Sequence, residues 1–123
     1  MKFLCLAYEE EAKLNGLSRS EWDALRSETL AYVDQLTRNG HLVAAEPLQS
    51  TREARTVRVR EGRSAVTDGP FAETKEQLGG FFMIEAADMD EAVQIASQWP
   101  SARFGSIEVR PVEPNLREER RYR

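Results

Sequence analysis

Two short segments of the chain are apolar at consecutive positions. Residues 3–7 read FLCLA and residues 81–84 read FFMI, and neither run contains a polar residue. A strand with one face in water alternates apolar and polar residues, whereas a strand covered on both faces is apolar throughout. Both segments are therefore predicted to be central strands of a sheet.

Each apolar strand is followed by a segment with the signals of an amphipathic helix. Ser18 and Glu21 form a capping-box pattern, and Asp88 and Glu91 repeat it. The first helix is predicted from residue 18 to about residue 38, where an asparagine–glycine pair ends it. Apolar residues recur at helical spacing in both segments, and the predicted buried stripes are Trp22, Leu25, Tyr32, Val33 and Leu36 in the first helix and Met89, Ala92, Val93, Ala96 and Trp99 in the second.

The middle of the chain has the pattern of a hairpin. Residues 56–60 alternate cleanly and residues 65–67 return after a turn, which predicts two paired strands with Val57 and Val59 on the covered side. Residues 71–77 follow a proline that is tolerated at the first position of a helix. They are predicted to hold a short helical turn, which the following glycine pair ends.

Two shorter strands, predicted at residues 42–48 and 106–112, complete two strand-helix-strand units. This order predicts an α+β, ferredoxin-like βαββαβ domain over residues 1–113, with the hairpin inserted and a charged tail at residues 114–123. Two helices cover only one face of such a sheet. The apolar residues of the other face predict that a second copy of the chain packs there, giving a homodimer in the form of a dimeric α+β barrel.

Composition argues against several functional classes. The 123 residues suffice for one domain, the net charge is -4, and the basic residues are interleaved with acidic ones, so no nucleic-acid partner is expected. Apolar runs are shorter than the about 20 residues of a membrane span and the about 7 of a secretory signal core, so a cytoplasmic protein without membrane contact is expected. One cysteine, Cys5, and one histidine, His41, are too few for a protein-only zinc site. No metal or cofactor is predicted, since the glycine pair also lacks a nucleotide-binding spacing.

The segment VTDGPFAETKEQLGGF at residues 66–81 closely resembles the signature of the YCII-related family in its DGPF branch. The resemblance covers most of the chain from about residue 40 to residue 112. It implies a dimeric ferredoxin-like α+β barrel. One branch member looks like a dehydrochlorinase of chlorinated hydroquinones, and a His-Asp pair facing a cleft has been proposed as the reactive centre of other YCII proteins.

The resemblance places the aspartate of that pair at Asp68. The histidine of the family lies within the first helix, whereas residues 18–38 of this chain contain none and His41 follows the helix. The resemblance therefore carries over only one member of the pair to a matching position.

The predicted site is a cleft at the loop that begins at Asp68, where this carboxyl would act as general acid or base if it is shielded from water. The alternative role for Asp68 is to accept backbone N–H bonds in the Gly-Pro turn. His41 is a second candidate for proton transfer, and its alternative role is to interact with the helix C-terminus. The predicted ligand contacts are Phe71, Glu73, Lys75, Glu76, Arg58 and Arg60. The alternative for the charged residues is a solvated surface with weak ion pairs.

Two functional hypotheses follow. The first is a small-molecule site for a small aromatic or anionic compound, with acid–base chemistry that needs no cofactor. The second is a non-catalytic module that senses a ligand or binds a protein. The resemblance makes a partner linked to transcription plausible, because family members are often encoded beside alternative sigma factors. Whether the protein is an enzyme is left open by the sequence.

Overall fold

The computed structural model describes residues 1–115 and 117. The charged tail predicted at residues 114–123 lies mostly outside the described residues. In chain order the elements are β1 (Lys2–Glu9), α1 (Glu11–Asn15), α2 (Arg19–Arg38), β2 (Leu42–Pro47), the 3-10 helix η1 (Thr51–Glu53), β3 (Arg55–Arg60), β4 (Arg63–Asp68), β5 (Gln77–Glu85), α3 (Met89–Ser97), the 3-10 helix η2 (Pro100–Phe104) and β6 (Gly105–Pro111).

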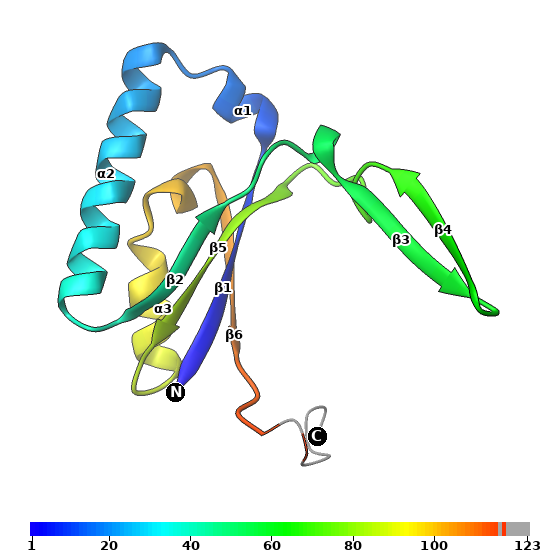
Figure 1. Ribbon diagram of the computed structural model, residues 1–123. Helices are drawn as coiled ribbons and strands as arrows, with labels where there is room; N and C mark the ends of the chain where they lie inside the picture. Colours follow the sequence, from blue (N-terminus) through cyan, green and yellow to red (C-terminus); the bar gives the residue numbers. More distant parts are fainter. Residues whose placement is uncertain (116, 118–123) are drawn as a thin grey trace.

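Four strands form one antiparallel sheet in the order β2-β5-β1-β6, and β3 and β4 form a separate two-stranded sheet. Helices α2 and α3 lie on one side of the four-stranded sheet, and the β3–β4 hairpin projects on the other side (Figure 1). The fold is thus mixed α+β. The two strands predicted to be central, β1 and β5, are the two inner strands of the sheet.

The core lies between the sheet and the helices. Along β1 the buried residues are Phe3, Cys5 and Ala7, so every second side chain faces the helices. On β5, Phe82 is fully buried and stacks on Trp99, with ring centroids 3.9 Å apart and planes at 10°. This alternation inside an apolar run shows that one face of each central strand forms the core.

The other face of the central strands carries apolar side chains that no helix within residues 1–115 covers. We call this surface the open face, and its apolar members, all half-buried, are Leu4, Leu6, Tyr8, Phe81 and Met83. Neighbouring side chains on the same sheet account for their partial burial. The sequence predicted coverage on both faces, and within one chain the coverage of this face is only partial.

The first long helix begins where the sequence predicted. Ser18 Oγ accepts a hydrogen bond from the Glu21 backbone N–H at 3.1 Å, and Glu21 Oε1 accepts from the Ser18 N–H at 2.9 Å. This reciprocal pair satisfies two backbone donors that the first helical turn leaves open. Helix α2 ends at Arg38, and Gly40 takes the left-handed conformation with φ of 81°.

The predicted buried stripes are wrong at three positions. Trp22 is 44% exposed, Met89 38% and Val93 49%. In α3 the buried residues are instead Ala92, Ile95 and Ala96, and Trp99 is buried just beyond the end of the helix. Both stripes fit helical spacing, and the small alanines let this face approach the sheet closely, which buries Ile95 between them.

Three further predictions around the hairpin are wrong. Val57 and Val59 are 62% and 59% exposed, because the hairpin extends away from the rest of the chain and nothing described covers that side. Residues 71–76 form bends and irregular backbone without a helical turn, and Gln77 begins β5. The glycine pair 79–80 does not end a helix but lies inside β5, where a Cβ on Gly80 would come within 2.9 Å of the Glu46 carbonyl oxygen of β2. Among the described residues, no helix is both long and apolar enough to cross a membrane.

Candidate functional site

The Asp68 side chain is not shielded from water within this chain. It is 89% exposed at the end of β4, and its Oδ1 lies 3.0 Å from Arg55 Nε in an ion pair across the base of the hairpin. The first residue of β3 and the last of β4 are direct cross-strand neighbours, which explains this pairing. The shielded general acid or base predicted at this position is therefore absent from the single chain.

His41 lies far from Asp68. Its Nδ1 is 2.8 Å from the carbonyl oxygen of Glu85, at the last residue of β5, whereas the Asp68 loop leads into the first residue of that strand. A nine-residue strand spans roughly 26 Å at about 3.3 Å per residue. The two residues predicted to be catalytic do not form a dyad within one chain, because the sheet places them at opposite ends.

The predicted ligand contacts are scattered over the surface. Glu76 Oε1 lies 3.0 Å from Ser106 Oγ, next to β6, and Phe71 is 80% exposed. Among the described residues, no hydrogen bond or ion pair joins any two of the eight predicted site residues. These are Asp68, His41, Phe71, Glu73, Lys75, Glu76, Arg58 and Arg60.

A recess does lie beside the Asp68 loop. It has a volume of about 730 Å³ and is bounded by the segment 48–54 on one side and the loop 70–78 on the other. Pro70 and Phe71 contribute apolar surface, and Tyr8 brings in the edge of the open face. Asp68, Arg58 and Arg60 do not line this recess.

A second cleft, of about 450 Å³, lies on the opposite side of the sheet, between α2 and the ends of β1, β2 and β5. We call it the α2 cleft. Its walls are largely apolar and aromatic, with Phe82, which stacks on Trp99, at the inner end and Trp22 at the outer end. Sequence reasoning did not single out this region, because its walls come from six separate elements.

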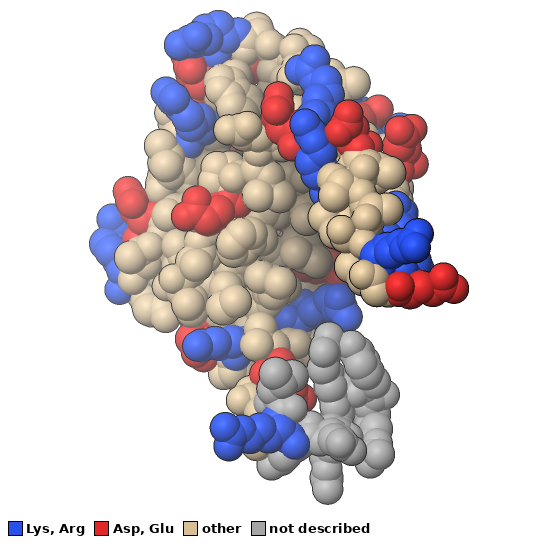
Figure 2. Space-filling model, turned by 45° about the vertical axis from the view of Figure 1, so that its right-hand side comes forward, with Lys and Arg blue, Asp and Glu red and all other residues tan. Residues whose placement is uncertain are grey.

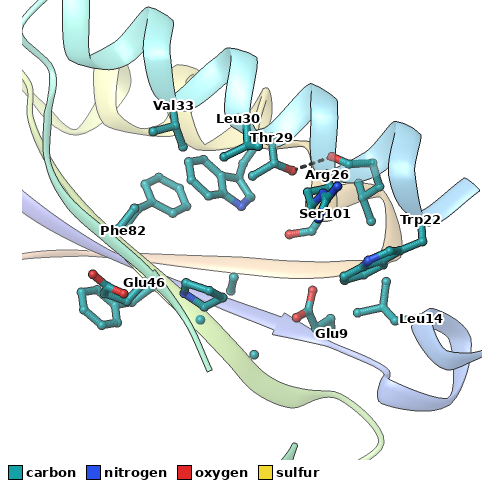
Figure 3. A pocket seen from close by; sticks show the side chains of 18 residues that line it. Glu9, Leu14, Trp22, Arg26, Thr29, Leu30, Val33, Glu46, Phe82 and Ser101 are labelled. Atoms are coloured by element: carbon teal, nitrogen blue, oxygen red, sulfur yellow. Dashed lines mark hydrogen bonds between the residues drawn. The ribbon is translucent and has the colours of Figure 1, made fainter. Parts of the chain in front are cut away.

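Two carboxylates, Glu9 and Glu46, line the α2 cleft, and Glu9 is the one that continues the core-facing row of its strand. Figure 3 shows its side chain reaching from the end of β1 into the cleft, with Arg26 of α2 and Ser101 of η2 on the other side. The residue continues the core-facing row of β1, in which Phe3, Cys5 and Ala7 are buried. The alternation of a strand thus directs this carboxyl toward the helices, just beyond the point where the core ends.

Gly79 makes room for the Glu9 side chain. The pairing of β1 with β5 shifts by one residue at this point, so that Ala7 pairs with Gly80 and Tyr8 with Leu78, and Gly79 is the extra residue of a bulge. A Cβ atom at position 79 would collide with Cγ, Cδ and Oε1 of Glu9. Glycine at this position is therefore a condition for the observed placement of the carboxyl.

The environment of Glu9 favours its protonated form. Burial, and to a smaller extent the negative charge of Glu11, raises the pKa of the Glu9 carboxyl above its ordinary value. Among the described residues, no hydrogen bond or ion pair involves this carboxylate. Trp22 and Leu14 line the cleft beside it. A carboxyl whose pKa is raised in a cleft is suited to donate or accept a proton.

Glu11, two residues further on, has the opposite environment. Its Oε1 accepts a hydrogen bond from the Thr51 backbone N–H at 2.8 Å, and its Oε2 accepts from Ser50 Oγ at 3.1 Å. The Thr51 bond is the main reason that the pKa of Glu11 is lowered. Two nearby carboxyls with pKa values pushed in opposite directions are typical of acid–base sites.

The described residues do not suggest a metal centre. No group of three or more histidine, cysteine, aspartate or glutamate side chains among them is arranged to hold a metal ion. Cys5 is fully buried in the core, and burial raises the pKa of its thiol to about 12. It is not placed to act as a nucleophile or a ligand.

Comparison with known proteins identifies a family, a relative and a similar solved structure. The family described as the YCII-related domain matches residues 1–115. An uncharacterised protein, R00369, of Rhizobium meliloti strain 1021 is 37% identical over 114 residues, which cover 91% of this chain and 92% of that protein. A solved structure of 5-chloro-2-hydroxyhydroquinone dehydrochlorinase from Burkholderia phenoliruptrix AC1100, in complex with 2,5-dihydroxybenzoquinone, is similar with a TM-score of 0.53 and 19% identity, covering 92% of this chain and 94% of the other. At that identity the likeness concerns the fold.

Proposed function

We propose a small-molecule function for this chain, which belongs to the YCII-related domain family. The α2 cleft binds a small ring compound, and Glu9 is the group that exchanges a proton with it. The observation that carries this proposal is the placement of Glu9, a half-buried carboxyl that points into a largely apolar cleft with a raised pKa.

The size and walls of the cleft support a flat, largely apolar ligand. Its volume of about 450 Å³ lies within the range of roughly 300 to 1,000 Å³ that is usual for small-molecule sites. Aromatic side chains such as Trp22 and Phe82 offer ring surfaces for stacking. The similar dehydrochlorinase structure contains 2,5-dihydroxybenzoquinone, a compound of this class, which makes hydroxylated rings the first candidates.

Two polar side chains of the α2 cleft, Glu9 and Arg26, have different proposed roles toward the ligand. Glu9, when protonated, donates a hydrogen bond to a ring oxygen, and when ionised it accepts a proton from a ring hydroxyl or an adjacent carbon. Arg26, across the cleft, supplies a permanent positive charge that stabilises an anionic oxygen of the ligand. This arrangement uses only side chains of the chain itself.

The open face supports a second element of the proposal, a homodimer. A cluster of half-buried aromatic and aliphatic side chains on a sheet face without a covering layer is the surface that a second copy of the chain covers. In that dimer the recess beside the Asp68 loop lies at the edge of the contact, since Tyr8 lines both. A second chain is also what shielding of Asp68 requires. A role for Asp68 in ligand binding, and the alternative of a transcription-linked protein partner, stay predictions.

Isothermal titration calorimetry with 2,5-dihydroxybenzoquinone and a set of hydroxylated benzenes tests the α2 cleft. We expect at least one compound to bind, with affinity reduced about tenfold or more in Glu9→Gln and in Trp22→Ala. Glu9→Gln removes the group that exchanges a proton with the ligand, and Trp22→Ala removes an aromatic side chain from the wall of the cleft. Asp34→Asn is the matched control, since Asp34 is an exposed carboxylate on the same helix as Trp22. Binding that is equal in all variants would contradict the proposed site.

A further inference from the structure

The hairpin of β3 and β4 has one apolar face that no described part of the chain covers. Val57 is paired directly with Val66 across the two strands, and Val59 lies on the same face one alternation further along. The three valines are 62%, 61% and 59% exposed in that order. The opposite face carries three arginines, an alanine and two threonines, so the hairpin is amphipathic.

Among the described residues, no hydrogen bond or ion pair joins the two strands of the hairpin to the four-stranded sheet or its helices, and two hydrogen bonds close the base of the hairpin. The Gly69 N–H donates to the Ala54 carbonyl oxygen at 2.9 Å, and Thr56 Oγ1 donates to the Gly69 carbonyl oxygen at 2.9 Å. Apart from Thr56, every residue of the two strands is exposed. An isolated two-stranded hairpin is at best marginally stable in water unless a third strand or another layer packs on it. The valine face therefore marks a missing contact surface.

The position of the hairpin indicates what supplies that surface. It projects from one end of the four-stranded sheet on the side opposite to α2 and α3, which is the side of the open face (Figure 1). The molecular surface is hollowed beside the hairpin, and the surface next to the hollow is mostly uncharged (Figure 2). A molecule that packs on the open face has to lie beside the hairpin as well.

Charge identifies a second copy of the chain as the occupant. The hairpin segment 55–68 contains four arginines and only two acidic residues, whereas the whole chain has a net charge of -4. The remainder of the chain is therefore acidic. Among the described residues, Arg58, Arg60 and Arg63 form no ion pair, and Glu46 is exposed on the edge strand β2 in register with Phe81 of the open face. A basic arm on an acidic body is complementary to itself about a two-fold axis.

We propose that the β3–β4 hairpin is an arm that clasps a second copy of the chain. Its valine face packs against the partner, while the arginines of its opposite face stay exposed and contribute long-range attraction to the acidic partner. This proposal rests on the homodimer proposed above for the open face and adds a contact that the flat pairing of two sheets does not require. It is independent of ligand binding in the α2 cleft.

Thiol accessibility in two single-cysteine-addition variants tests the arm. Val57→Cys places a thiol on the valine face, and Ala65→Cys places one on the opposite face of the same hairpin, in register with Arg58. The native Cys5 does not contribute to the measured reaction, because its side chain is fully buried. The rate at which each thiol reacts with a disulfide reagent is measured over a range of protein concentrations. Analytical ultracentrifugation reports the fraction of associated protein at each concentration.

We expect the Val57→Cys thiol to react about tenfold or more slowly in the associated protein than after dilution, and the Ala65→Cys thiol to react equally fast in both. Hydrogen exchange of the unmodified protein gives a second readout that needs no variant, since the amides of β3 and β4 should be protected only at concentrations that favour association. A dimer in which both thiols react equally, with unprotected hairpin amides, would overturn the arm and leave the pairing of open faces standing. A protein that is monomeric at all concentrations would overturn both.

Discussion

The Glu9 carboxyl occupies the space that a side chain at Gly79 would fill, so the placement of the one residue depends on the identity of the other. Glu9 ends the core-facing row of β1, and Gly79 is the extra residue of the bulge on β5. The two residues are distant in sequence, and the sheet brings them together. The proposed acid–base group of the α2 cleft is thus positioned by a backbone feature of the neighbouring strand.

Substitution Gly79→Ala should displace Glu9 from the cleft. The added methyl group collides with the carboxyl, which has to turn toward water, and we expect the pKa of Glu9 to fall toward its ordinary value. Crowding at the bulge should also lower the free energy of unfolding by about 1 to 3 kcal/mol. NMR titration of the Glu9 carboxyl and urea denaturation measure the two effects.

The matched control is Gly16→Ala, because Gly16 has φ of -83° and a Cβ there meets only the Ala12 and Lys13 carbonyl oxygens at 3.4 and 3.5 Å. This variant should leave the pKa of Glu9 unchanged. An unchanged Glu9 pKa in Gly79→Ala would show that the carboxyl does not depend on this glycine.

The stability of the protein should depend on pH through Glu9. Its folded pKa is raised, so the folded state binds more protons than the unfolded state between the ordinary glutamate pKa and the raised value. The contribution of Glu9 to stability is therefore greatest at low pH and decreases as pH rises through that window. In Glu9→Gln this dependence disappears, and the variant should be at least as stable as the natural sequence at pH 7.

Thermal unfolding of both proteins between pH 4.5 and 7.5 checks this expectation, with Asp34→Asn as a carboxylate-removing control on the protein surface. Parallel pH profiles for the natural protein and Glu9→Gln would mean that Glu9 titrates alike in the folded and unfolded chain.

Removal of the Glu11 carboxylate should affect both stability and the α2 cleft. Glu11→Gln loses the charge-assisted bond from the Thr51 N–H, which holds segment 50–51 against the N-terminal part of the chain. We expect a loss of about 1 to 2 kcal/mol in the free energy of unfolding. Because the charge of Glu11 raises the pKa of Glu9, the same variant should lower that pKa slightly. A Glu9 pKa that rises in Glu11→Gln would contradict the sign of this coupling.

Cys5 should be unreactive in the folded protein. It is fully buried, and burial raises the pKa of its thiol to about 12, so almost no thiolate is present at pH 8. A thiol reagent should therefore label the protein only at the rate at which it unfolds, and one equivalent should react at once in denaturant. Rapid labelling without denaturant would show that the β1 core is more open than described.

Local patterns predicted the main elements of the fold. The capping box at Ser18 and Glu21 gave the start of α2, and the apolar runs gave the two central strands, because these signals depend only on neighbouring residues. The same apolar run gave no sign that successive side chains of β1 alternate between the core and the open face. In a run without polar residues nothing marks which side chains face the core, so the row that ends in Glu9 was not recognised.

The candidate site was mostly beyond sequence reasoning for a related reason. Gly79 has the appearance of a helix stop, and its role follows only from its contact with Glu9 across the sheet. Asp68 lies in a segment that resembles a family signature, yet its exposure depends on the hairpin, which projects away from the body of one chain. Such contacts are set by tertiary structure, whereas motifs report residue types and spacing.

The most direct test of the account is an NMR titration of the Glu9 carboxyl, assigned by comparison with Glu9→Gln, in the free protein and with 2,5-dihydroxybenzoquinone added. We expect Glu9 to titrate above the ordinary glutamate pKa of about 4.3, and its midpoint or chemical shift to move when the compound binds. A Glu9 carboxyl that titrates near the ordinary value, and that neither this compound nor any hydroxylated benzene of the set perturbs, would contradict the assignment of the α2 cleft as the ligand site.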